Sequence, residues 1–351
     1  MNKQFKLESL VRENIRNLSP YSTARDEARG EVNVFLDANE SPYANGGYNR
    51  YPDPHQKELK KRIGVIKGIN PENIFLGNGS DEAIDLIYRV FCTPGKDNIV
   101  SISPTYGMYS VCGHINDVEV REVPLDEDFN LPVEALLKAC DRKTKVIFLC
   151  SPNNPTGNAF PTEDILRIVE SFKGIVVLDE AYADFSSKGS LRKYIYEYDN
   201  LIILQTFSKA YGLAALRLGM AFAQKDIIAY FSKVKYPYNI NKSTQDLVSA
   251  AILKPITVNT AHTISQRGTM ARFLSRLDIV EKIYPSEANF LLVKFYDADK
   301  VYDYLISKGI IVRNRSHVPG CRNCLRITVG TQKENIKTLE YLMEYDKSDI
   351  R

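Results

Sequence analysis

Three short apolar runs in the middle of the chain, at residues 145–150, 174–178 and 201–204, each end in polar, turn-forming residues. In open α/β sheets, ligands bind outside the carboxyl ends of the strands, so we expect these polar ends to face one site. The side chains they supply are Asn154, Asp179, Tyr182, Ser208 and Lys209. A lysine amine can bond a carbonyl carbon, and a carboxylate or a phenol beside it can hold or move protons. Each end taken alone is equally typical of a loop that turns the chain.

A glycine-containing turn earlier in the chain is a candidate anion site. Residues 76–82 are Leu-Gly-Asn-Gly-Ser-Asp-Glu, and an amphipathic stretch follows at 83–91. A helix that starts after such a turn leaves backbone N–H groups free, and its dipole favours an anion there. However, Glu82 stands where a dinucleotide-binding fingerprint has its third glycine, and no Gly-Lys-Ser/Thr motif occurs. A nicotinamide dehydrogenase or a nucleotide-binding enzyme is therefore disfavoured.

The elements around these residues predict a parallel sheet. The three apolar runs are nearly continuous in apolar residues, as expected of strands that are buried on both faces. Between the first two runs, residues 162–172 have apolar side chains at helical spacing and acidic residues in the first turn. This alternation indicates an α/β domain with a mostly parallel central sheet flanked by helices.

The pattern changes after about residue 255. A polar helix-like stretch at 261–277 precedes a strand at 288–294, a helix at 297–308 and strands at 309–313 and 325–329. These elements predict a second, smaller α+β domain. Residues 1–43 are irregular and polar, and we expect them to wrap around the larger domain. Our division is 44–258 for the larger domain, with 1–43 and 259–351, both chain ends, forming the smaller one.

Composition restricts the possible partners. The 351 residues include 46 basic and 43 acidic side chains, so the net charge of +3 gives no reason to expect nucleic acid or an acidic membrane surface. No segment has the roughly 20 apolar residues of a membrane helix, and the N-terminus lacks the apolar stretch of a secretory signal. We therefore expect a cytoplasmic protein.

The six cysteines are scattered through a chain too large to need a disulfide framework. Cys321 and Cys324 form a Cys-x-x-Cys pair, but a zinc site needs two further ligands, and no second Cys or His pair supplies them. An acidic residue or His317 could complete such a site, so metal or redox use stays open as the lesser alternative. We expect no metal.

The ordered motifs resemble a known enzyme family. Asn-Pro-Thr-Gly at 154–157, Asp-Glu-Ala-Tyr at 179–182 and Ser-Lys at 208–209, with Arg217 eight residues further on, are similar to fold-type I aminotransferases that use pyridoxal 5'-phosphate (PLP). Further segments resemble the histidinol-phosphate aminotransferase family; they lie at 18–21, 36–43, 49–53, 235–241, 309–313 and 324–331. The stretch 253–271 is less similar, but it lies outside the motifs.

The resemblance implies roles around the cofactor ring. Lys209 would bond the cofactor aldehyde and later move the proton between substrate and cofactor, and Asp179 would keep the pyridine nitrogen protonated. Asn154 and Tyr182 would hydrogen-bond the ring oxygen O3', and Tyr106 would stack on the ring.

The resemblance also implies a phosphate site. The backbone N–H groups of Ser80 and Asp81, the Ser208 hydroxyl and the Arg217 guanidinium would hold the cofactor phosphate. Tyr51 would reach the same phosphate from the neighbouring subunit, which implies a homodimer with shared active sites.

Substrate contacts follow from the same resemblance. Arg326 matches the arginine that holds a carboxylate, while Arg313 and Tyr21 match positions that bind the phosphate of L-histidinol phosphate. Glutamate would use the same pocket in the other half-reaction, and Arg315 could assist or could be a surface charge. The implied reaction, a step of histidine biosynthesis, moves an amino group between L-histidinol phosphate and 2-oxoglutarate and gives imidazole acetol phosphate and glutamate.

Several alternatives remain at this point. A threonine-phosphate decarboxylase, or an aromatic or broad-range aminotransferase, would share nearly every cofactor contact, because fold and cofactor site do not determine the reaction. A regulatory protein that senses a ligand through a PLP-binding domain would need an added DNA-binding module. The N-terminal region contains neither a basic helix nor room for a helix-turn-helix.

Overall fold

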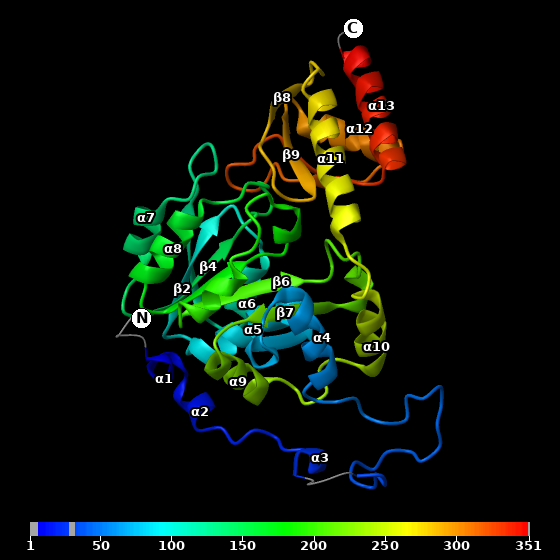
Figure 1. The fold of residues 1–351 in the computed structure, drawn as a ribbon. Coiled ribbons are helices and arrows are strands. Elements are labelled where there is room, and N and C mark those ends of the chain that lie inside the picture. The colour runs from blue at the N-terminus through cyan, green and yellow to red at the C-terminus, as the bar shows by residue number, and fades with distance from the viewer. Residues whose placement is uncertain (1–5, 28–31, 350–351) are drawn as a thin grey trace.

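Two β-sheets organise the chain, and the larger of them carries the polar strand ends (Figure 1). The structure is a computed structural model that describes residues 6–27 and 32–349. The strands of the larger sheet are β1 Ile74–Asn78, β2 Asn98–Ser103, β3 Glu119–Pro124, β4 Thr144–Cys150, β5 Ile175–Asp179, β6 Leu201–Thr206 and β7 Leu218–Phe222. Those of the smaller sheet are β8 Val280–Ile283, β9 Phe290–Phe295, β10 Arg313–Asn314 and β11 Cys324–Thr328.

The larger sheet has the order β1-β7-β6-β5-β4-β2-β3. Among these seven strands β7 runs opposite to the other six, and it pairs antiparallel with β1 and β6; β6, β5, β4, β2 and β3 pair with one another in parallel. The prediction of a mostly parallel sheet is confirmed, and β4, β5 and β6 coincide with the three apolar runs. Because parallel neighbours end at the same edge, the polar residues after these three strands meet there.

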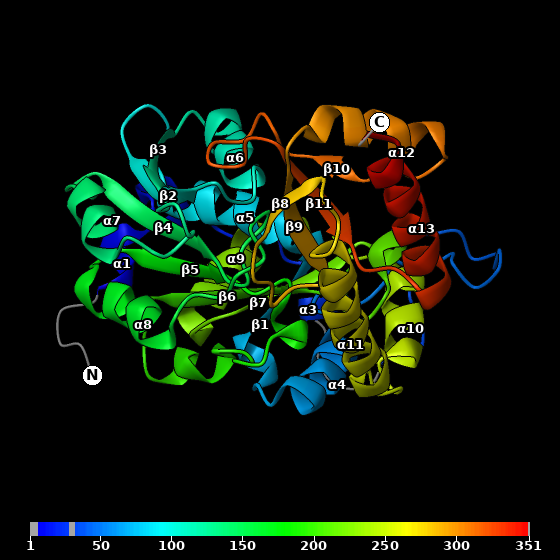
Figure 2. The same cartoon turned by 90° about the horizontal axis from the view of Figure 1, so that it is seen from above.

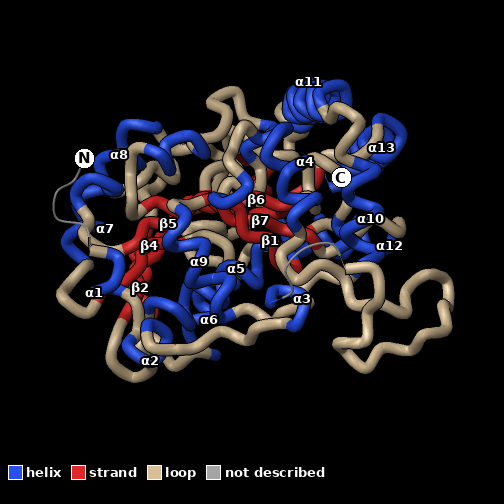
Figure 3. Tube along the Cα trace, turned by 60° about the horizontal axis from the view of Figure 1, so that its bottom comes forward, coloured by secondary structure: helices blue, strands red, loops and turns tan. Residues whose placement is uncertain are grey.

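Helices cover both faces of this sheet, which explains why its central strands are apolar throughout (Figure 3). Side chains from α4, α7, α8 and α10 pack on one face, and side chains from α5, α6 and α9 pack on the other. The helices of this part of the chain are α4 Lys57–Lys67, α5 Gly79–Phe91, α6 Met108–Ile115, α7 Val133–Ala139, α8 Thr162–Ser171, α9 Lys225–Val234 and α10 Lys242–Ala251. Short 3-10 turns lie at Pro71–Asn73, Ala183–Phe185, Arg192–Tyr196 and Ala214–Leu216.

The smaller sheet is antiparallel, in the order β10-β11-β9-β8, and has an apolar core of its own. It packs with α11 Thr257–Leu274, α12 Ala298–Ser307 and α13 Gln332–Asp349 to one side of the larger sheet (Figure 2). The predicted strand at 309–313 is shorter than expected, because Gly309 adopts a positive φ of 76° just after α12. Pairing therefore begins only at Arg313.

The N-terminal helices α1 Leu7–Leu10 and α2 Glu13–Arg16 differ from the expected division. Val11 and Ile15 are buried in the core of the larger part, and the Arg12 N–H donates to the Val90 carbonyl at 2.9 Å. Burying such side chains contributes about 1.5–3 kcal/mol each. This end of the chain therefore joins the larger part rather than the smaller one. Residues 1–5, on which the expectation about a secretory signal partly rests, and 28–31 lie outside the described residues.

Residues 32–56, which precede α4 and follow the short helix α3 Ala24–Glu27 in the sequence, form a long segment that extends away from the body of the molecule (Figure 1). Its anchor is the buried carboxylate of Glu40, which accepts hydrogen bonds from Arg25 at 2.8 Å, Arg50 at 2.9 Å and the Tyr51 N–H at 2.6 Å. Burial alone would raise the pKa of Glu40, but these hydrogen bonds outweigh it and lower the pKa. The segment thus keeps a defined shape with little core of its own.

No helix in the described part of the chain is long and apolar enough to cross a membrane.

Candidate active site

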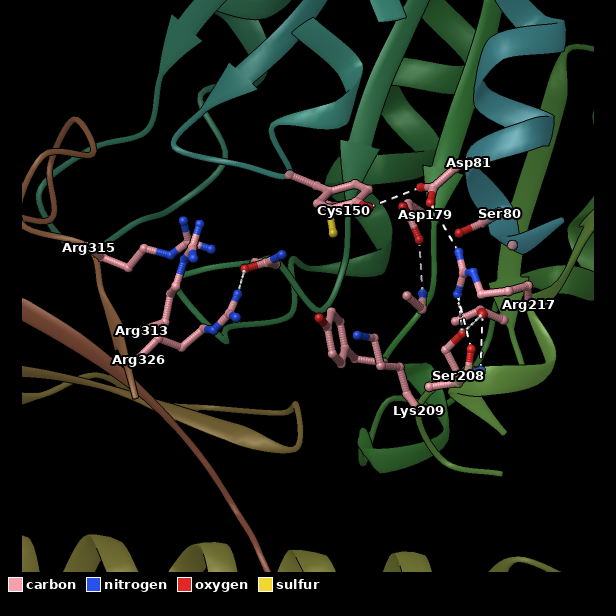
Figure 4. A pocket seen from close by; sticks show the side chains of 17 residues that line it. Ser80, Asp81, Cys150, Asp179, Ser208, Lys209, Arg217, Arg313, Arg315 and Arg326 are labelled. Carbon is pink, nitrogen blue, oxygen red and sulfur yellow. Dashed lines mark hydrogen bonds and ion pairs between the residues drawn. The ribbon is translucent and has the colours of Figure 1, made fainter. Parts of the chain in front are cut away.

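A cavity of about 400 Å³ lies where β4, β5, β6 and the start of α5 face the β10–β11 ladder (Figure 4). Every site residue predicted from the sequence lines it, except Tyr21 and Tyr51. Its lining comprises Gly79, Ser80, Asp81, Tyr106, Cys150, Asn154, Asp179, Ala181, Tyr182, Thr206, Ser208, Lys209, Ala214, Arg217, Arg313, Arg315 and Arg326.

Asp179, the last residue of β5, is the buried acid of the site, with 2% of its surface exposed. Its Oδ2 accepts a hydrogen bond from the Tyr109 hydroxyl at 2.8 Å, and its Oδ1 accepts one from the Ala181 N–H at 3.0 Å. Burial raises the pKa of Asp179 to about 6, although both hydrogen bonds oppose the shift. At neutral pH this carboxylate is charged in a poorly solvated place, so a cationic partner would be strongly favoured.

Tyr109 is a site residue that the sequence analysis missed. It lies on α6, fully buried, with its ring stacked on Phe148 at a centroid distance of 4.9 Å. Burial is the main cause that raises its pKa, so the hydroxyl stays protonated and donates to Asp179. The available signal was indirect: a tyrosine on the buried face of a helix needs a partner for its hydroxyl, but the sequence does not reveal which one.

Lys209 follows β6 and places its amine 5.4 Å from the centre of the Tyr182 ring. The residue is exposed to the open cavity, but the protein around its amine lowers the pKa by desolvation, and the charge of Arg326 lowers it further. Asp179 acts in the opposite direction. The net lowering makes the neutral, nucleophilic amine more accessible near neutral pH.

One end of the cavity is built for an anion. Ser80 and Asp81 lie in the first turn of α5, where backbone N–H groups have no partner within the helix. Gly219 on β7 lies against this turn so closely that a Cβ there would overlap the Ser80 nitrogen. Arg217 donates to the Ser208 hydroxyl oxygen at 3.4 Å. The start of a helix, a hydroxyl and a guanidinium thus surround one position, and all three are groups that bind phosphate.

Tyr106 closes this end of the cavity. Its hydroxyl donates to Asp81 Oδ1 at 3.0 Å, and its ring meets the Tyr109 ring edge-on at a centroid distance of 5.6 Å. Burial raises its pKa, so the phenol stays protonated. The cavity wall therefore offers an aromatic ring between the phosphate-type site and the buried acid.

The opposite end of the cavity is cationic. Arg313 and Arg326 are directly paired across the β10–β11 ladder, and Arg315 lies beside them in the cavity wall (Figure 4). Arg326 donates to the side-chain oxygen of Asn154, and its guanidinium lies 5.2 Å from the centre of the Phe290 ring. Arg315, for which an assisting role and a surface charge were both left open, is half-buried and lines the cavity.

Tyr21 and Tyr51 do not line this cavity in the single chain. They are 74% and 50% exposed, and Tyr51 stacks on Tyr238 at 4.4 Å. Arg25, four residues after Tyr21, donates to the Tyr51 carbonyl at 3.1 Å and to Glu40 at 2.8 Å, so the chain next to Tyr21 is held against the segment that contains Tyr51.

Within residues 6–27 and 32–349, no group of three or more His, Cys, Asp or Glu side chains could hold a metal ion. Cys321 and Cys324 are buried in a turn in which the Cys324 N–H donates to the Cys321 carbonyl at 3.0 Å. Burial raises the pKa of Cys321 to about 12 and that of Cys324 to about 11. Both thiols are therefore poor nucleophiles near neutral pH.

Comparisons with known proteins agree on one family for this chain. Residues 14–342 match the family model described as aminotransferase class I and II. The chain is 53% identical over 331 residues to histidinol-phosphate aminotransferase from Parabacteroides distasonis, covering 94% of this chain and 96% of the relative. It is 52% identical over 342 residues to the protein of the same name from Bacteroides fragilis, covering 97% and 99%.

A solved structure shows the same fold. The histidinol-phosphate aminotransferase from Sinorhizobium meliloti, in complex with pyridoxal-5'-phosphate, superposes with a TM-score of 0.78 at 25% identity. The match covers 86% of this chain and 84% of that chain.

Proposed function

The chain belongs to the aminotransferase class I and II family, and from that premise we propose that it transfers an amino group from L-histidinol phosphate to 2-oxoglutarate. The products are imidazole acetol phosphate and glutamate. It is a PLP-dependent aminotransferase, and its relatives at about half identity over nearly the whole chain carry the name of this reaction. The observation in the site that supports the substrate is the arginine-lined end of the cavity, which suits a phosphate.

The donor set fits PLP. The start of α5, Ser208 and Arg217 would hold its phosphate, and the charged, buried Asp179 would hold the proton on its pyridine nitrogen. Bound PLP accepts the electron pair that is released when the substrate Cα loses its proton.

Side chains of the protein itself would carry out the remaining steps of the amino transfer. The Lys209 amine, with its lowered pKa, is the group that would hold the cofactor through its aldehyde and would carry the proton from the substrate Cα. Asn154 and the protonated Tyr182 would donate to the ring oxygen of bound PLP. The Asn154 side-chain oxygen already accepts from Arg326, which leaves its NH₂ group to donate. As a further part of this proposal, the larger domain is the one that binds PLP, and it ends near residue 258, within the first turn of α11.

The phosphate group of the amino donor should determine which substrate the enzyme prefers. Leaving a desolvated charge without its partner costs about 2–5 kcal/mol, and each 1.4 kcal/mol is about tenfold in rate or affinity. The arginines are partly exposed, so we expect the lower part of this range. L-Histidinol should have a kcat/KM on the order of 30- to 100-fold below that of L-histidinol phosphate, with 2-oxoglutarate as acceptor.

Equal values for the two donors would show that the phosphate is not recognised, and an aromatic or broad-range aminotransferase would then describe the chain better. Release of CO₂ from threonine phosphate, with no amino transfer, would instead identify a decarboxylase.

A homodimer is the proposed working unit, with Tyr51 reaching the cofactor phosphate and Tyr21 the substrate end of the partner's pocket. Support comes from their exposure and from the apolar side chains that the same segment leaves in solvent: Val34, Leu36 and Tyr43. Exposed apolar patches on an ordered segment mark interaction sites. We place the dimer in the cytoplasm, where free thiols stay reduced.

Hybrid dimers test this shared site. Lys209→Ala chains and Tyr51→Ala chains, each strongly impaired, should form mixed dimers in which one of the two pockets carries neither change. Activity of the mixture should rise to roughly a quarter of the wild-type value, provided that subunits exchange at random. If mass spectrometry shows exchange and activity does not rise, Tyr51 serves its own chain or has no part in the site.

A further inference from the structure

Three arginines lie close together at the short β10–β11 ladder, two of them in the ladder and Arg315 directly after β10. Arg313 and Arg326 are direct cross-strand partners, and the Arg315 N–H continues the pairing with a hydrogen bond to the Cys324 carbonyl at 2.9 Å. Arg315 lies two residues after Arg313 and, like Arg313, lines the cavity (Figure 4). Like charges placed directly opposite each other destabilise a ladder unless an anion lies between them.

No carboxylate in the cavity wall compensates this cluster. The lining acids are Asp81 and Asp179, and they are engaged elsewhere, with Arg217 and with Tyr109. The Nε atom of Arg315 is buried and has no hydrogen-bond partner within the described residues. After burial, the charges of Arg326 and Arg313 are the largest causes that lower the pKa of Arg315. The residues that line the cavity thus offer no anionic partner to this group, and a bound anion could supply one.

We propose that Arg315 is a specificity-determining residue, which lets the pocket distinguish a phosphate dianion from a carboxylate. The proposal rests on the proposed function and extends it. A phosphate monoester carries nearly two negative charges and three acceptor oxygens at neutral pH, so it can occupy three guanidinium groups. A carboxylate has one charge and two oxygens, and a single bidentate arginine satisfies it. Arg326 serves both half-reactions, and Arg315 acts chiefly on the phosphorylated donor.

Arg315 is better placed for this task than the exposed Arg313. It is half-buried, so solvent and salt screen its charge less. Its backbone is held at both ends, because its carbonyl also accepts the Val318 N–H at 2.8 Å. The buried Cys321 and Cys324 support the same turn. A guanidinium on so fixed a backbone loses little freedom when it binds an anion.

The test separates the two half-reactions by following the cofactor absorbance in single turnovers. For Arg315→Gln, kcat/KM with L-histidinol phosphate should fall about 10- to 100-fold, and the fall with glutamate should be at least about tenfold smaller. Arg315→Lys, which keeps a charge but not the fork, should recover part of the lost ratio. Arg322→Gln is the matched control: it removes an exposed arginine from the same turn that does not line the cavity, and the ratio should not change.

A second measurement does not depend on turnover. Calorimetric titration of the holoenzyme with inorganic phosphate should show at least about tenfold weaker binding in Arg315→Gln, with a smaller change for acetate. Equal losses for both substrates, or no loss, would overturn the role of Arg315 while leaving the proposed function intact. If the wild-type enzyme itself does not prefer L-histidinol phosphate to L-histidinol, the proposed function falls, and this inference falls with it.

Discussion

Replacing Lys209 by alanine is expected to lower turnover by at least about 10⁴-fold, because one residue both bonds the cofactor and moves the proton. Positioned proton transfer alone contributes about 10²–10⁴-fold, and the lost covalent step adds to it. Lys209 is the lysine among the residues that line the cavity, so no other lysine of this lining could replace its amine. The measurement is single-turnover conversion of L-histidinol phosphate by the purified variant.

The chain should stay folded after this change, because Lys209 is exposed to the cavity and supports no core cluster. Lys209→Arg keeps the positive charge and should be as inactive as the alanine variant, which separates chemistry from electrostatics. Borohydride reduction of the wild-type holoenzyme and peptide mapping should locate the pyridoxyl label on residue 209. A label on another lysine would refute the assignment.

Asp179→Asn should lower kcat on the order of 10²- to 10³-fold, as losses of one preorganised electrostatic partner commonly do. A neutral amide cannot hold the proton on the pyridine nitrogen. It can still engage the Tyr109 hydroxyl, which both donates and accepts, so the shape of the site should survive. Near-wild-type turnover in this variant would show that the buried charge has no part in the reaction.

The same substitution should stabilise the cofactor-free chain. The pKa of Asp179 is about 6 in the folded protein, against about 3.9 unfolded. An acid with a raised folded pKa binds more protons folded than unfolded between these values, so stability falls as pH rises through this window. At pH 7 the buried charge costs on the order of 3 kcal/mol.

Cofactor-free Asp179→Asn should therefore melt a few degrees above the cofactor-free wild type at pH 7, and the difference should shrink as the pH is lowered to 5. A variant that melts lower at pH 7 would mean that Asp179 stabilises the fold, and its role as a strained functional group would have to be abandoned.

The sequence predicted the larger sheet well because its central strands are buried on both faces. Such strands are short apolar runs, and β4, β5 and β6 stand out for that reason. Because ligands bind at the carboxyl ends of parallel strands, the sequence also predicted that Asn154, Asp179 and Lys209 lie together. Residue spacing cannot identify a cofactor or the role of each side chain. The resemblance to the aminotransferase family supplied both.

Contacts that depend on tertiary packing could not be predicted from the sequence. Tyr109 has the pattern of an ordinary core tyrosine, and only the fold brings its hydroxyl to Asp179. Arg315 could not be told from a surface charge, because its burial depends on how the turn after β10 packs. Val11 and Ile15 are two apolar residues in a polar segment, which is too weak a pattern to show that this segment joins the larger core.

The buried thiols of the turn that follows Arg315 have a practical consequence for kinetics. Cys321 and Cys324 are inaccessible and have raised pKa values while the turn is closed, so alkylating reagents can modify them only during transient opening. The alkylation rate at these two positions therefore measures how often this wall of the pocket opens. An anion held by the arginines should slow that rate in proportion to its occupancy, which gives a label-based binding assay without any engineered probe.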